Sequence, residues 1–233
     1  MLTPEPDVPV ESSEMTAAPT PHAELASATR LERGLDVAAA VLSLVPWLGG
    51  PVSQVLSGMS IERKMERVKE VLDGLAQDLG EFHSEASEEY VRSGEFQDIL
   101  EQTLRQVADE RNEEKRHAYR LFLRGTIEHP GGPYDEQRRF LRILEQIQGD
   151  HIRIMKAMLQ QPEANVGTMG SPIQTLRRRL PDMPQALIAD LVGQLNDMRL
   201  TNVTSLNVMM TAHGAANLHH AFTSYGLRFI AYL

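Results

Sequence analysis

The sequence predicts a mainly α-helical protein, in which a helical bundle with an apolar N-terminal helical hairpin is followed by a C-terminal module with a small β-hairpin. Apolar residues recur at helical spacing along most of the middle of the chain. Clusters of Gly and Pro divide that pattern into helix-length segments. The pattern changes at residue 150, so we expect a disordered tail over 1–34, a helical bundle and hairpin region over 35–149 and a further domain over 150–233.

The composition excludes several classes of chemistry. The 233 residues include no Cys, which excludes disulfides, thiolate catalysis and Cys-ligated zinc and predicts a cytoplasmic protein. The net charge is −9, and residues 1–110 alone carry 8 basic and 21 acidic side chains. That acidic first half disfavours non-specific binding to nucleic acid there, because a phosphate backbone attracts basic surfaces.

The first 28 residues are rich in Pro, Ala, Ser, Thr and Glu. They have no basic region followed by an apolar run, so we expect no signal peptide. Such a composition buries too little apolar area to offset a chain entropy of about 1–2 kcal/mol per residue. We therefore predict that the tail is disordered.

An uncharged segment of 25 residues runs from Val37 to Ile61. Pro and Gly residues at 46–51 divide it into two arms, each shorter than the roughly 20 residues that cross a bilayer. A buried helix–turn–helix is the favoured interpretation, and an interfacial, re-entrant or kinked membrane segment is the alternative. The residues that would form the core of the hairpin, or its membrane-facing surface, are Leu44, Val45, Trp47, Leu48, Val52, Val55 and Leu56.

A heptad pattern begins after Ser60, which we expect to be an N-cap. It predicts either a helix of an intramolecular bundle or a dimer seam. Its apolar positions are Ile61, Met65, Val68, Leu72, Leu75 and Leu79.

A second helix is predicted from the N-cap Ser93, with an apolar stripe that continues to Ile127, and the loop 129–133 ends it. The following helix carries Arg138, Arg139 and Arg142 on the side opposite its apolar stripe. Together with basic residues at 111–124, they could contact an acidic partner or phosphates. The alternative is ordinary pairing with nearby Glu residues one helical turn away.

The C-terminal segment predicts three short helices and a β-hairpin. Asp150 would cap the first helix, Ser171 and Pro172 would open the second, and Pro184 would open the third. The β-like runs 206–210 and 218–222 would pair across a turn at 213–214. Thr223 would then cap a last helix.

This order of elements, and the ending FTSYGLRFIAYL, resemble the small bacterial winged-helix modules. The match depends on Phe222, Thr223, Gly226, Phe229 and Leu233 and covers about 80 residues. It implies a winged-helix fold for residues 150–233. The segment VPWLGGPVSQVLSG with its following helix resembles the front part of uncharacterised bacterial helical proteins, which implies no activity.

A DNA-reading module should present Arg, Lys, Asn or Gln from its third helix to the major groove. The outward positions expected here are neutral to acidic: Gln185, Ala189, Asp190, Gly193, Gln194, Asn196 and Asp197. Only Arg177, Arg178 and Arg179, on the second helix, would meet phosphates. The charge therefore favours a module that contacts protein or a second copy of itself.

No catalytic motif is recognisable. The sequence has no phosphate-binding glycine loop ending in GKS or GKT, no G-x-S-x-G and no H-E-x-x-H. We expect His213, His219 and His220 to lie on a surface hairpin that holds no metal. The leading hypothesis is a non-enzymatic regulatory or adaptor protein with no cofactor and no small-molecule substrate, acting through protein contacts or self-association. The alternatives are a DNA-binding transcriptional regulator and a membrane-acting effector that uses the apolar hairpin.

Overall fold

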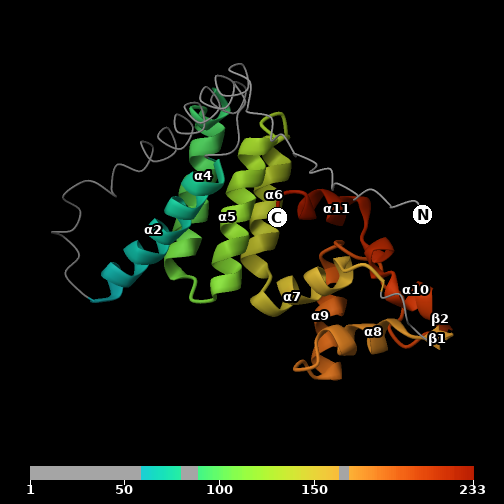
Figure 1. Cartoon of the computed structure of the whole chain (residues 1–233). Coiled ribbons are helices and arrows are strands. Elements are labelled where there is room, and N and C mark those ends of the chain that lie inside the picture. Colours follow the sequence, from blue (N-terminus) through green and yellow to red (C-terminus); the bar gives the residue numbers. More distant parts are fainter. Residues whose placement is uncertain (1–58, 80–88, 163–167) are drawn as a thin grey trace, which may run out of the picture.

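The computed structural model describes residues 59–79, 89–162 and 168–233 (Figure 1). The predictions for the tail 1–34 and for the hairpin residues 44–56 lie outside the described residues. The helices of the bundle and the connecting helix are α2 (Met59–Leu79), α4 (Gly94–Asp109), α5 (Glu113–Glu128), α6 (Tyr134–Gln146) and α7 (Gly149–Leu159). The C-terminal elements are β1 (Met169–Gly170), α8 (Pro172–Arg179), α9 (Gln185–Asp197), β2 (Met210–Thr211), α10 (Ala212–Ala216), η3 (Leu218–Ala221) and α11 (Ser224–Ile230).

The predicted mainly helical character is confirmed for the described residues. Helices α2, α4, α5 and α6 lie side by side, and α7 leads from them to α8, α9 and α10 (Figure 1). The heptad positions Val68, Leu72, Leu75 and Leu79 of α2 are buried, and α2 packs against both α4 and α5 of its own chain. The bundle interpretation of the heptad is therefore confirmed. Ser60 is not the N-cap, because the helix already includes Met59.

The stripe predicted to run unbroken to Ile127 is divided between two helices. Ser93 caps α4 as predicted, and its side-chain oxygen accepts a hydrogen bond from the Phe96 N–H at 3.2 Å. The chain then turns at Asn112, whose side-chain oxygen accepts from the Lys115 N–H at 2.9 Å and caps α5. The first backbone N–H groups of a helix have no carbonyl partner within it, and a short polar side chain at the N-cap accepts a hydrogen bond from one of them.

Helix α7 begins one residue before the predicted cap Asp150. Its N-cap is Gln148, whose backbone N–H donates to Nδ1 of the buried His151 at 3.0 Å. The prediction that Asp150 is the N-cap was wrong, because Asp150 lies within the first turn of the helix. Its carboxylate is 3.2 Å from the guanidinium of Arg153.

The small sheet pairs two segments whose pairing was not predicted from the sequence. Strand β2 runs antiparallel to β1, with Met169 opposite Thr211 and Gly170 opposite Met210. The hairpin predicted between 206–210 and 218–222 was wrong, because 212–216 form α10 and 218–221 form the 3-10 helix η3. Thr211 caps α10 by accepting from the Gly214 N–H at 3.2 Å, which replaces the predicted turn by a helical one. The resemblance to winged-helix modules stays a prediction.

The last helix begins where the sequence predicted. The Thr223 hydroxyl accepts from the Gly226 N–H at 2.9 Å and donates to the Arg199 carbonyl at 2.7 Å. A Cβ atom built at Gly226 would lie 2.8 Å from the carbonyl carbon of Leu200 and closer still to its oxygen. This approach of two backbones explains why the position holds glycine.

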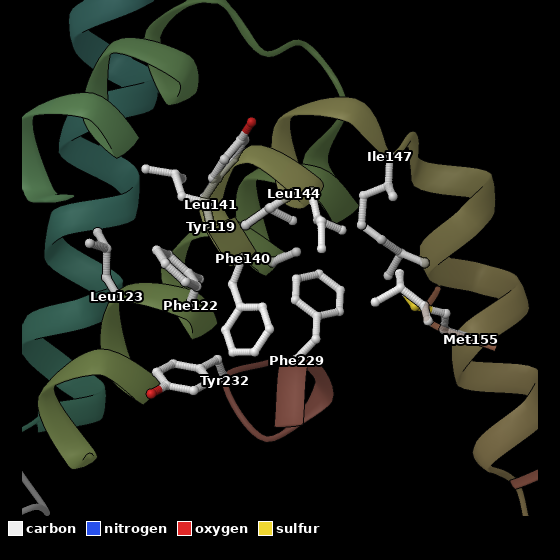
Figure 2. Close-up of a cluster of buried hydrophobic side chains, with 14 of the residues drawn as sticks. Tyr119, Phe122, Leu123, Phe140, Leu141, Leu144, Ile147, Met155, Phe229 and Tyr232 are labelled. Atoms are coloured by element: carbon white, nitrogen blue, oxygen red, sulfur yellow. The ribbon is translucent and has the colours of Figure 1, made fainter. Parts of the chain in front are cut away.

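The C-terminal helix packs onto the bundle (Figure 2). The Phe140 ring of α6 lies 5.6 Å from the Phe229 ring of α11 and 5.3 Å from the Tyr232 ring, measured between centroids. A Cβ atom at Gly125 of α5 would lie 2.7 Å from the Tyr232 Cα, so α5 also approaches this end of the chain closely. One continuous hydrophobic cluster extends from Val68 to Tyr232 and joins the two regions that the sequence separated at residue 150.

Candidate functional site

A hollow in the described part of the chain has a volume of about 760 Å³. Its walls are β1, one face of α8, the turn between α8 and α9, and α10. The side chains and backbone of these elements give it both polar and apolar lining. The lining residues are Met169, Gly170, Gln174, Thr175, Arg177, Arg178, Pro181, Asp182, Met183, Pro184, Gln185, Ala212 and Ala215.

Helix α8 orients two of the predicted arginines toward this hollow. Arg177 and Arg178 follow Gln174 by three and four residues, so each lies near Gln174 on the helix surface, and all three line the hollow. The opposite face buries Ile173 and Leu176 in the core. The burial of that face fixes the rotation of the helix and leaves both arginines exposed.

Arg179 does not share the predicted role of its two neighbours. Its guanidinium donates to the carbonyl oxygens of Ala157 at 2.7 Å, Gln161 at 3.2 Å and Ala216 at 3.1 Å. These bonds join the end of α8 to the end of α7 and to α10. Arg179 is thus engaged with the backbone, whereas Arg177 and Arg178 line the hollow, and a phosphate contact by Arg179 stays a prediction.

The charge balance of the hollow is positive. Asp182, the one carboxylate among the described lining residues, accepts two hydrogen bonds from Arg153 at 2.8 and 2.6 Å. The hydrogen bond from Arg153 lowers the pKa of Asp182, so this carboxylate is ionised and already paired at neutral pH. Arg177 contacts the amide oxygen of Gln185 at 3.4 Å. Within the described residues neither Arg177 nor Arg178 has an ion pair with a carboxylate.

Apolar side chains are exposed beside the hollow. Met169 of β1 is 57% exposed, and Val208 and Met209, which precede β2, are 48% and 56% exposed. The antiparallel pairing of β1 with β2 brings these segments together. Contiguous exposed apolar side chains of this kind are typical of interaction surfaces, whereas single ones are ordinary.

The outward face of α9 contains no Lys or Arg, and it exposes Asp190 and Asp197. Asn196, predicted to face outward, is turned toward the following loop. Its side-chain oxygen accepts from the Thr201 hydroxyl at 2.7 Å and from the Val203 N–H at 3.0 Å. The predicted base-reading surface of α9 therefore exposes two carboxylates, and one of its amides is engaged within the chain.

The predicted arginines of α6 lie on a different element, which packs against α4 and α5. Arg139 and Arg142 are exposed, while Arg138 lies over the Tyr134 ring at 5.6 Å. The basic residues of α5 are largely used within the bundle. Arg116 lies 3.2 Å from Glu70 and Arg120 lies 3.1 Å from Asp78, both pairs joining α5 to α2 rather than spanning one helical turn.

The histidines predicted to lie on a hairpin are on α10 and η3 instead. The rings of His219 and His220 lie side by side, with centroids 3.9 Å apart and an angle of 40° between their planes. Among the described residues there is no group of three or more His, Asp or Glu side chains that could hold a metal ion. The same residues include no helix with the length and apolar character needed to cross a bilayer.

Comparison with known proteins gave no assignment: neither a family model, nor a curated protein, nor a solved structure matches the chain.

Proposed function

We propose that the chain is a non-enzymatic regulatory or adaptor protein, and that it binds another protein through the surface formed by α8, the small sheet and α10. The observation that supports this most directly is the proximity of Arg177 and Arg178, which have no ion pair with another described residue, to an exposed apolar rim at Met169 and Met209. Arg and Met are enriched in protein interfaces, whereas Lys and Glu are depleted there.

DNA binding is the second candidate, and the exposed arginines of α8 and α6 favour it. The acidic outward face of α9 opposes it, because in winged-helix and helix-turn-helix proteins the third helix is the one that enters the major groove. Helix α6, which includes Arg139 and Arg142, belongs to the bundle, whereas α8, which includes Arg177 and Arg178, lies on the far side of α7 (Figure 1). The charge of these individual arginines therefore supports a phosphate-binding role, but their placement on two separate helices does not.

The experiment is affinity capture from native lysate with the full chain as bait and two matched variants. Met209→Asp places a charge in the proposed surface, and Leu227→Asp places one on α11, where the side chain is similarly exposed at 45%. We expect Met209→Asp to lose proteins that Leu227→Asp retains. Equal capture by both variants would contradict the proposed surface. A shift of duplex DNA at low salt that Arg177→Glu plus Arg178→Glu abolishes would favour the second candidate.

A further inference from the structure

We infer that the hollow beside α8 receives an acidic peptide segment of the partner, with carboxylates meeting Arg177 and Arg178 and an apolar side chain between Met169, Met183 and Ala215. This inference rests on the proposed function and specifies the chemistry of the partner.

The charge of the hollow selects an acidic occupant. Arg177 and Arg178 both line it, and Asp182, the one carboxylate among the described lining residues, is held by Arg153 through two hydrogen bonds. A guanidinium presents parallel N–H donors that match the two oxygens of a carboxylate. A basic segment would bring like charges together, which costs several kcal/mol in an interface.

The shape of the hollow adds an apolar requirement. Met183 and Ala215 are 5% and 1% exposed, so they form an apolar floor below the charged rim. Met169 stands at the edge and is 57% exposed. Methionine side chains adapt to the shape of an inserted group, and an apolar floor with a few polar groups is the usual form of a binding pocket.

A peptide fits this combination better than a nucleic acid does. A duplex would place phosphates against Arg177 and Arg178 but has no apolar side chain to occupy the floor formed by Met183 and Ala215. An acidic peptide with one apolar side chain meets both requirements.

The test begins with a random peptide library displayed on phage and selected against the full-length protein. The variant Arg177→Glu plus Arg178→Glu serves for counter-selection, and Arg139→Glu plus Arg142→Glu is the control with equal charge change on α6. We expect the enriched peptides to be acidic with an apolar residue. The first variant should bind them about tenfold or more weakly, whereas the control should bind them as the wild type does. Binding should also weaken as salt is raised from about 0.05 to 0.3 M.

A second measurement locates the peptide and verifies the fold. In protein labelled with 13C at the methionine methyl groups, an enriched peptide should shift the signals of Met169 and Met183 and leave those of the core residues Met155 and Met158 unchanged. Unchanged core signals in Arg177→Glu plus Arg178→Glu would show that this variant is folded.

Three outcomes would overturn the inference. The first is that the selection enriches neutral or basic peptides, or no peptides. The second is that the two variants bind the enriched peptides equally. The third is that duplex DNA binds through Arg177 and Arg178 whereas acidic peptides do not bind. If capture from lysate is lost in Met209→Asp but retained in Arg177→Glu plus Arg178→Glu, the acidic-peptide inference fails and the proposed function stands.

Discussion

Replacing Gly226 by Ala tests the close packing of the last helix. A Cβ atom there would lie 2.8 Å from the carbonyl carbon of Leu200 and 3.0 Å from its Cα. The obstacle is backbone, which cannot turn aside as a side chain can. Helix α11 must therefore move away from Leu200, although Phe229 is fully buried against Phe140 and Thr223 is bonded to the Arg199 carbonyl.

The expected loss follows from those contacts. Forcing a methyl group into a well-packed site costs about 1–3 kcal/mol. Partial exposure of one large apolar side chain, here Phe229, adds a fraction of the roughly 1.5–3 kcal/mol that its full burial contributes. We expect Gly226→Ala to lower the free energy of unfolding by about 2–4 kcal/mol, since the two effects overlap.

Urea unfolding followed by circular dichroism measures this loss, and Gly193→Ala is the control. Gly193 lies inside α9, and a Cβ atom there would meet nothing within 4 Å. Alanine in a helix interior is about 0.5–1 kcal/mol more favourable than glycine, so this variant should be more stable than the wild type. If Gly226→Ala is within about 0.5 kcal/mol of the wild type, the steric argument is refuted.

Three further predictions concern single residues. Arg199 has a φ of 60°, a left-handed conformation that favours glycine. Arg199→Gly should therefore raise the free energy of unfolding, measured in urea, by about 0.5–1 kcal/mol. A decrease would show that the Arg199 side chain stabilises the fold by more than the backbone strain costs. Burial lowers the pKa of His151, and its Nδ1 accepts from the Gln148 N–H, so the folded state favours the neutral ring. The unfolded chain then binds the proton more readily, and the stability present above pH 6.5 should be lost as the pH falls through the lowered pKa. Comparing the free energy of unfolding at about pH 7.5 and pH 5 should show a smaller loss in His151→Gln than in the wild type, and an equal loss would exclude His151 as the cause. Arg179→Ala should lower the melting temperature and cost about 1–3 kcal/mol of stability, because it removes donors to three carbonyl groups. Arg178→Ala should leave the free energy of unfolding within about 0.5 kcal/mol of the wild-type value. Equal effects of the two substitutions would contradict the different roles of the two arginines.

Local patterns predicted most of the helices. The heptad of α2, the cap at Ser93 and the cap at Thr223 depend on residues within one or two turns of each other, so the sequence alone carries them. The division between α4 and α5 could in principle also be predicted from the sequence. Asn112 followed by Glu113 and Glu114 is a good N-cap with acidic residues in the first turn, but the continuing apolar stripe obscured it.

The sheet and the site were less accessible from the sequence. The partner of β2 is a two-residue strand about 40 positions earlier, and nothing in either segment specifies that pairing. The sequence analysis named the three adjacent arginines of α8 as candidate contacts, and the structure places two of them, Arg177 and Arg178, in the lining of the hollow. That Arg179 turns back could not be predicted, because its acceptors are carbonyls at the ends of two other helices.

The packing of α11 against α5 and α6 affects the order in which the molecule can assemble. Chains generally begin to fold from the N-terminal side during synthesis. A nascent polypeptide that ends before Phe229 and Tyr232 would leave one side of Phe140 open to water, however well its first helices have formed. Completion of the interior must therefore wait until these late residues have left the ribosome, and until then this part of the aromatic surface has no cover from α11.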